Sequence, residues 1–108
     1  MLALYEKALQ ADPEDFETNF NIGILHYQYK HDMDTALKYL LTAIQDEDNN
    51  VTALFNIAVI YEEKGDMKNA KQYYAKVLEI DPSNSKARVN MGVCLDKEGK
   101  SEEAQNQY

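Results

Sequence analysis

Apolar residues recur at steps of three and four along residues 51–84, in two runs that a single glycine separates. The runs consist of Leu54, Ile57, Ala58 and Tyr61, followed by Ala70, Tyr74, Val77 and Leu78. This spacing places each run on one face of an α-helix. Gly65, between the runs, suits the left-handed backbone at a helix C-terminus, and Pro82 disfavours helical geometry in the residue before it. The segment therefore predicts two helices joined by a short turn.

The same pattern returns along the rest of the chain with a fixed period. Ala36, Ala70 and Ala104 lie 34 residues apart, and other positions repeat with a period of 34 or 35 residues. These are Gly65 with Gly99, Tyr74 with Tyr108, Asn56 with Asn90, Asn21 with Asn56, Tyr5 with Leu40, and Ala8 with Ala43. A period in this range is the signature of stacked two-helix units. The change from 35 to 34 requires one extra residue between Gly23 and Ala36, which predicts a first helix that runs on or bulges before its turn.

These repeated residues resemble the tetratricopeptide repeat (TPR) family over nearly the whole chain. The family pattern places a large apolar residue, then leucine-glycine, an aromatic, a turn glycine, alanine, an aromatic, alanine and proline. Residues 51–84 supply Leu54, Ile57, Ala58, Tyr61, Gly65, Ala70, Tyr74, Val77 and Pro82. The later unit supplies Met91, Gly92, Leu95, Gly99, Ala104 and Tyr108, and the earlier one supplies Ile22, Gly23, Ala36, Leu40, Ala43 and Ile44. The earlier unit departs from the pattern at the turn, where Lys30 or His31 replaces the glycine.

The resemblance implies an all-α fold, a right-handed α-solenoid of antiparallel helix pairs (a TPR superhelix) with about seven helices. In this single array we expect residues 1–15 to be the second helix of a partial repeat and residues 16–50 to be a repeat with the extra residue. Residues 51–84 are then a complete repeat and residues 85–108 an incomplete one. Because no polar capping element is visible at either end, we expect a section of a longer array. The apolar residues expected at its end faces include Tyr5, Leu9 and Tyr108.

Several repeated residues are expected to serve packing. Closely packed helices need small side chains where their axes approach, so Gly23, Ala58 and Gly92 are expected to face Ala36, Ala70 and Ala104, respectively. Tyr5, Tyr74 and Tyr108 are expected to fill gaps between successive units, with their hydroxyls reaching an edge or a carbonyl.

The amino-acid composition and net charge limit the kinds of partner and the compartment that we expect for this chain. The chain has 108 residues, of which 44% are hydrophobic, and this is enough for one continuous core. The net charge of −8 disfavours nucleic acid, because phosphate contacts depend on lysine and arginine, and it disfavours anionic membrane surfaces. No apolar run approaches the ~20 residues that span a bilayer. With a single cysteine there is no disulfide framework, so we expect a cytoplasmic or nuclear protein.

No arrangement of residues indicates catalysis, and we predict that the chain is not an enzyme and has no cofactor, no metal site and no catalytic residue. Cys94 has no histidine in its own repeat or the one before it, so a packed thiol is expected. His26 and His31 are five residues apart, which does not place two ligands on one helical face. The acidic run at residues 46–48 lacks the spacing and glycine of a calcium loop.

Three asparagines in one repeat position are the main candidates for binding. The resemblance implies that first helices line the concave face, where Asn21, Asn56 and Asn90 would recur one unit apart. An amide offers a donor and an acceptor together, which matches a peptide bond, so such a ladder can hold an extended peptide by its backbone. The column looks like the asparagine ladder in the superhelix of the O-linked N-acetylglucosamine transferase, whose catalytic domain is absent here. The alternative is structural: each asparagine bonds a neighbouring helix and tunes the pitch.

The same face carries an apolar strip, and part of it is expected to be exposed. Its members are Phe20, Ile24, Phe55, Val59, Val89 and Val93. A family relative with a two-carboxylate clamp would need lysines and an arginine on three first helices. Asn56 and Lys86 fall at clamp positions, but Phe20, Ile24 and Asn90 replace a lysine, an asparagine and the arginine. Most of the positive charge is missing, so this clamp is not expected. Lys86 itself remains a candidate peptide-binding residue of the groove.

The predicted function is therefore a protein–protein interaction scaffold. Its concave groove would bind an extended peptide or an amphipathic helix through the asparagine ladder and the apolar strip. The partner would be a protein or peptide, neutral to basic, with apolar anchors, and neither nucleic acid nor a membrane. The alternative is an architectural segment of a longer superhelix that docks, or associates with itself, through its end faces.

Overall fold

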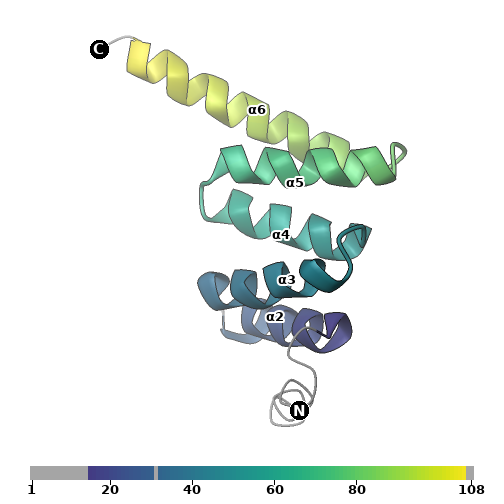
Figure 1. Cartoon of the computed structure of the whole chain (residues 1–108). Helices are drawn as coiled ribbons and strands as arrows, with labels where there is room; N and C mark the ends of the chain where they lie inside the picture. Colours follow the sequence, from purple (N-terminus) through teal and green to yellow (C-terminus); the bar gives the residue numbers. More distant parts are fainter. Residues whose placement is uncertain (1–14, 31, 107–108) are drawn as a thin grey trace. The chain divides into compact units, whose positions relative to one another are not determined.

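The structure is a computed structural model that describes residues 15–30 and 32–106. Within these residues it has five α-helices and no strand (Figure 1). The helices are α2 (Phe16–Lys30), α3 (Met33–Asp46), α4 (Val51–Glu63), α5 (Met67–Ile80) and α6 (Ser85–Asn106). The all-α prediction is confirmed for this part of the chain. The helix expected within residues 1–15, and the end-face residues Tyr5, Leu9 and Tyr108, lie outside the described residues.

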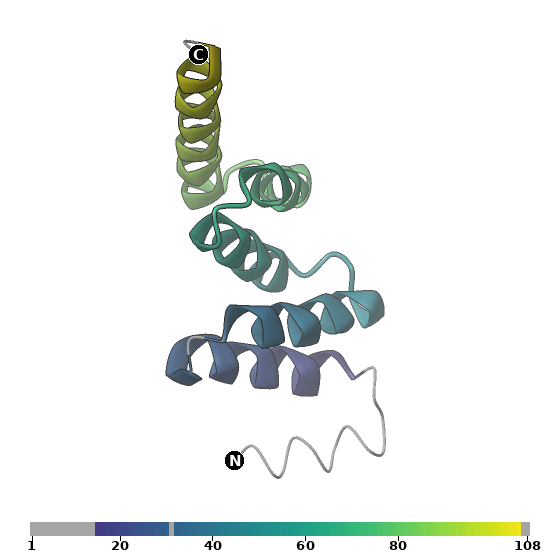
Figure 2. The ribbon, with the colours of Figure 1, turned by 90° about the vertical axis from the view of Figure 1, so that its left-hand side faces the viewer.

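The chain divides into two compact units, Met1–Ala53 and Leu54–Tyr108. In the first unit α2 and α3 lie side by side (Figures 1 and 2). Their shared core contains Ile22, Ala36, Leu37, Leu40 and Ala43, all buried. Gly23 allows the close approach of the two helices, because a Cβ there would lie 2.8 Å from Cγ of Leu40 and 3.1 Å from the carbonyl oxygen of Ala36. The prediction that Gly23 faces Ala36 is confirmed.

The extra residue of the first repeat lies between His26 and Asp32, where α2 ends. In the second repeat the backbone N–H of Asp66 donates to the carbonyl of Tyr61, whereas in the first the N–H of Asp32 donates to the carbonyl of His26, one residue further back. Accordingly α2 has 15 residues and α4 has 13. The first helix therefore runs on before its turn, as the change of period predicted.

In the second unit a glycine and a cap separate α4 from α5. Gly65 has a φ of 85°, the left-handed conformation expected for it. Asp66 then caps α5, since its carboxylate accepts hydrogen bonds from the backbone N–H of Asn69 at 3.1 Å and from its side-chain amide at 2.7 Å. These hydrogen bonds hold the pKa of Asp66 below its ordinary value. The buried core of this unit comprises Leu54, Ile57, Ala58, Ile60, Ala70, Tyr74, Val77, Ala87 and Cys94.

Side-chain caps mark every described helix start, at positions that repeat with the units. The first helices are capped by Asp15, Asn50 and Asn84, whose side-chain oxygens accept from the backbone N–H groups of Thr18, Ala53 and Ala87. The second helices are capped by Asp32 and Asp66. Each cap satisfies a backbone donor that would otherwise lack an intrahelical acceptor. Helix starts are thus fixed locally as well as by packing.

The last repeat differs from the prediction. The sequence pattern predicted a turn at Gly99 and a second helix around Ala104, but α6 is one continuous helix of 22 residues from Ser85 to Asn106. In Figure 2 it extends past α5. Lys100 occupies the position of the capping Asp32 and Asp66, and an ammonium group cannot accept a backbone hydrogen bond. A glycine alone costs a helix only about 1 kcal/mol relative to alanine, so the helix continues.

As a consequence, the predicted facing of Gly92 with Ala104 is wrong. Nothing lies within 4 Å of a Cβ built at Gly92. The expected helix count of about seven is not reached either, because the described residues contain five helices and the predicted last pair is merged into α6.

Gly23 and Gly92 are equivalent in the repeat pattern but opposite in environment, which gives a matched pair of variants. Gly23→Ala is expected to lower the free energy of unfolding by about 1–3 kcal/mol, because the new methyl group overlaps Leu40 and the Ala36 carbonyl. Gly92→Ala is expected to raise it by up to about 1 kcal/mol through helix propensity alone. Urea denaturation followed by circular dichroism measures both. Equal effects of the two substitutions would contradict the close approach at Gly23.

Candidate functional site

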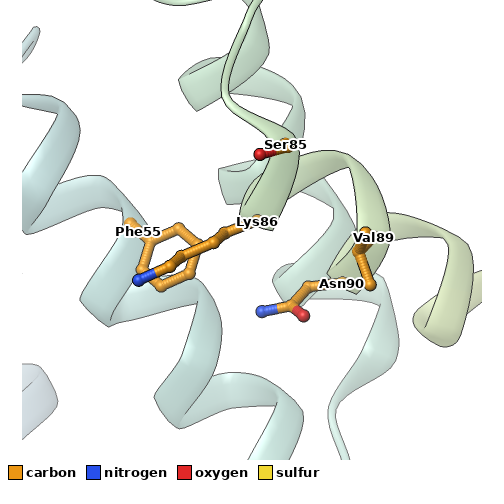
Figure 3. Close-up of a pocket in the computed structure, with 5 residues that line it drawn as sticks. All are labelled: Phe55, Ser85, Lys86, Val89 and Asn90. Carbon is orange, nitrogen blue, oxygen red and sulfur yellow. The ribbon is translucent and has the colours of Figure 1, made fainter.

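A small pocket lies in the second unit between α4 and α6. It has a volume of about 290 Å³ and is lined by Phe55, Ser85, Lys86, Val89 and Asn90. Figure 3 shows Lys86 and Asn90 projecting from α6 toward Phe55. The volume is at the lower end of the range for ligand pockets, ~300–1,000 Å³, so it suits one side chain better than a larger ligand. Phe55, Lys86, Val89 and Asn90 were all predicted as binding residues, and the structure brings these four together.

The local sequence places the α6 residues on one face. Asn84 caps α6 through the N–H of Ala87 at 3.0 Å, so Ser85 and Lys86 are in the first turn. Lys86, Val89 and Asn90 are then spaced by three and four residues, which puts them on the same side of the helix. Val89 remains 64% exposed and Lys86 is exposed. The pocket therefore offers an apolar wall, a cation and an amide to an approaching chain.

The remaining predicted residues lie elsewhere. Asn56 and Val59 are half-buried on α4, and Val93 on α6 is 38% exposed. Phe20, Asn21 and Ile24 are half-buried on α2, in the first unit. The ring of Phe20 stacks on Phe16 with centroids 5.6 Å apart. The strip is thus most exposed at Val89 and Val93.

A polar chain behind the pocket links all three helices of the second unit. The hydroxyl of Tyr74, on α5, donates to Oε1 of Glu62 on α4 at 2.8 Å, and Nδ2 of Asn90 donates to that hydroxyl at 3.1 Å. Tyr74 is fully buried, and its ring meets the edge of Phe55 with centroids 5.7 Å apart. Nζ of Lys97 lies 3.7 Å from Oε2 of Glu62. We refer to Glu62, Tyr74 and Asn90 as the polar relay.

The polar relay was only partly foreseen. Its tyrosine hydroxyl was expected to reach an edge or a carbonyl, but it binds a carboxylate and an amide. The structural alternative for the asparagine column is realised in part, since Asn90 bonds a neighbouring helix. The relay joins residues 12 and 16 positions apart in the sequence, and no helical periodicity connects such positions. A buried tyrosine with a carboxylate in the preceding helix is the signal that could have indicated it.

Two buried groups near Glu62 have raised pKa values. Burial raises the pKa of Tyr74 above its ordinary 10.0, and the hydrogen bond to Glu62 raises it further. Burial also raises the pKa of the Cys94 thiol above 9.0, with a further contribution from the Glu62 carboxylate. Cys94 is fully buried, in agreement with the expectation of a packed thiol.

These raised pKa values predict alkaline sensitivity. Both groups are neutral when folded, so their stabilising contribution is complete below the unfolded-state pKa values of 9.0 and 10.0. It is lost as the pH rises toward the folded-state values. We expect the free energy of unfolding to fall above about pH 9, by at most ~1.4 kcal/mol per pH unit for each group. Urea titrations across this range test the decline, and Tyr74→Phe should make it shallower; an unchanged slope in that variant would contradict the assignment.

Within the part of the chain that the structure describes, no helix is both long and apolar enough to cross a bilayer. Among the same residues, no three or more histidines, cysteines or acidic residues are grouped so that they could hold a metal ion.

Comparison with solved structures gives several close matches in fold. The crystal structure of MamA protein superposes with a TM-score of 0.85 over 97% of this chain at 20% sequence identity, and the match covers 57% of the MamA chain. The first TPR of Spaghetti (RPAP3), solved bound to the HSP90 peptide SRMEEVD, has a TM-score of 0.82 at 19% identity over 91% of this chain and 77% of that chain. At such identities the likeness shows the fold alone. No curated protein sequence matches this chain.

Sequence models of the tetratricopeptide repeat match the chain twice, over residues 51–84 and over residues 73–106. The two matches together span more than half of the chain, and they cover the helices that form the pocket and the polar relay. The periodic residues, the paired helices and these matches agree that the chain belongs to the tetratricopeptide repeat family.

Proposed function

We propose that the chain is a protein–protein interaction module that binds an extended peptide or an amphipathic helix along its first helices. The pocket formed by Phe55, Lys86, Val89 and Asn90 carries this proposal, since it combines apolar surface on α4 and α6 with polar groups on α6. Such a combination can grip a peptide by its backbone and anchor one of its side chains. The wider groove would include the asparagine ladder of Asn21, Asn56 and Asn90, set in a right-handed solenoid.

The net charge of the chain, and a solved structure of similar fold with a bound peptide, support a neutral to basic protein or peptide as the partner. The related fold of the first TPR of Spaghetti (RPAP3) was solved with a bound peptide, SRMEEVD. That peptide carries three acidic residues, whereas this chain has a net charge of −8. Because like charges repel at an interface, we propose a neutral to basic partner with apolar anchors. With a single cysteine and no disulfide framework, we further propose that binding takes place in the cytoplasm or nucleus, without cofactor or catalysis.

Selection from phage-displayed random peptides tests the proposal. Peptides selected on the intact chain are expected to share an apolar residue, and to bind the combined Asn21→Ala, Asn56→Ala and Asn90→Ala variant at least about tenfold more weakly, since each hydrogen bond contributes ~0.5–1.5 kcal/mol. The melting temperature should drop only slightly, although Tyr74 loses the hydrogen bond that Asn90 donates. Gln28→Ala with Gln72→Ala, two exposed amides outside the column, is the control. Unchanged binding by the triple variant would refute the ladder.

An architectural segment is the second candidate function. It is supported by Leu95, which is 53% exposed on α6, since an exposed apolar side chain can mark an association surface. Concentration-dependent association in analytical ultracentrifugation, lost in Leu95→Glu, would favour this candidate. A monomer at high concentration would exclude it for this chain.

A further inference from the structure

The direction of the hydrogen bonds in the polar relay is fixed by chemistry. An ionised carboxylate can only accept, and the Tyr74 hydroxyl has one hydrogen, so that hydrogen goes to Oε1 of Glu62, 2.8 Å away. The hydroxyl oxygen can then only accept from Asn90, which must present Nδ2, at 3.1 Å. Because Tyr74 is fully buried and its ring packs against Phe55, this arrangement cannot rotate freely. The orientation of the Asn90 amide therefore follows from Glu62, two helices away.

This orientation decides what Asn90 offers to the pocket. One hydrogen of Nδ2 is engaged by Tyr74, and none of the described residues donates a hydrogen bond to Oδ1 of Asn90. The unpaired group is an acceptor on a residue that lines the pocket together with Phe55, Ser85, Lys86 and Val89. A half-buried acceptor gains most from a ligand that brings an N–H. The exposed cation of Lys86 sits on the same wall of α6 and favours a carbonyl oxygen.

We infer that Glu62 and Tyr74 are positioning residues that hold Asn90 with Oδ1 toward the ligand, so that the pocket selects an apolar peptide residue whose backbone N–H donates to Asn90. This inference rests on the proposed peptide-binding function and specifies its central contact. The apolar side chain packs against Phe55 and Val89, the backbone N–H binds Oδ1 of Asn90, and the backbone carbonyl faces Lys86. Each group of the ligand thus has a complementary group in the pocket.

Two small probes test this contact by NMR titration of the isotopically labelled chain. N-acetyl-leucine N-methylamide keeps its backbone N–H groups. In the second probe, N-acetyl-N-methyl-leucine dimethylamide, methyl groups replace those hydrogens. Ligands of this size bind with dissociation constants on the order of millimolar. We expect the first probe to bind about three- to tenfold more tightly, the effect of one hydrogen bond, and to shift the signals of Phe55, Val89 and the Asn90 amide.

Tyr74→Phe separates positioning from packing, because it removes the hydroxyl and keeps the ring. In this variant the ratio of the affinities of the first and second probes is expected to fall toward one. The side-chain amide protons of Asn90 should also exchange faster with water. Tyr73→Phe, at the neighbouring tyrosine that stacks on Tyr61, should retain the preference of the unmodified chain. Glu62→Gln should also reduce this preference. A glutamine amide can donate a hydrogen bond to Tyr74, so the direction of the hydrogen bonds in the polar relay is no longer fixed.

The outcomes distinguish the inference from the proposed function. If both probes bind the unmodified chain equally, or if Tyr74→Phe keeps the full preference, the pocket binds apolar residues but the polar relay does not select them. If neither probe shifts Phe55, Val89 or Asn90, the pocket does not bind peptide residues, and the proposed function fails with the inference. A preference that disappears in Tyr74→Phe and persists in Tyr73→Phe supports the inference.

Discussion

Replacing Tyr74 by alanine is expected to lower the free energy of unfolding by about 3–5 kcal/mol, the usual cost of deleting a buried aromatic side chain. Tyr74 is fully buried, and three contacts depend on it. Its ring meets the edge of Phe55, its hydroxyl donates to Glu62, and the same hydroxyl accepts from Asn90. The substitution leaves a cavity among α4, α5 and α6, and it leaves a carboxylate and an amide without their partner.

Urea denaturation measures this loss, and two further variants divide it into its parts. Tyr74→Phe retains the ring and should cost only about 1–3 kcal/mol, the penalty for polar groups left unpaired. Tyr73→Ala removes a half-buried tyrosine from the same helix and should cost clearly less than Tyr74→Ala. If Tyr73→Ala destabilises the chain as much as Tyr74→Ala, then Tyr74 is not the centre of this core.

Leu40→Ala is expected to have the second largest effect, a loss of about 2–5 kcal/mol. Leu40 is fully buried between α3 and α2, in the unit that also contains Gly23. Its Cγ would lie 2.8 Å from a Cβ at Gly23, so no space is left between the two helices. Truncating Leu40 therefore opens a cavity beside Gly23, where the two helices are in close contact. Hydrogen exchange should show the increased opening in α2 and α3.

Combining this substitution with Gly23→Ala gives a thermodynamic cycle. The methyl group added at Gly23 occupies space that Leu40→Ala vacates, so the double variant should be more stable than the sum of the single effects predicts, by about 0.5–3 kcal/mol. The two substitutions do not compensate each other fully, because the methyl group at residue 23 would also lie 3.1 Å from the backbone carbonyl oxygen of Ala36. That carbonyl group cannot be removed by substitution. Strict additivity would show that the two positions do not contact each other.

The repeat pattern predicted most of the local architecture. It predicted the helix end at Gly65, the apolar helical faces within residues 51–80 and the extra residue before Ala36. Each of these features is determined by residues that are close together in the sequence. The repeat pattern also identified Val89 and Asn90 beside the pocket, because both occupy recurring repeat positions, whereas Lys86 was identified from its position in the family's clamp. Phe55 joined them because it occupies the repeat position of Val89.

Features that depend on single departures from the period were missed. Gly99 was interpreted as a turn because it matches Gly65, yet the aspartate that follows Gly65 is replaced by Lys100, and without that cap α6 continues. The partners within the polar relay of Glu62, Tyr74 and Asn90 were also not predicted, because they depend on side-chain geometry among three helices. A repeat pattern identifies the positions that all units share, whereas these features depend on residues that differ from one unit to the next.

The capping residues have a consequence for how such chains lengthen. Asp32 and Asp66 start the second helices, and Asn50 and Asn84 start the first, in each case 34 residues apart. A duplicated stretch of that length brings its own start signals with it, whichever residue the copying begins from. Gene duplication can therefore add a working unit in one step, with no later mutation needed to tell the new helices where to begin.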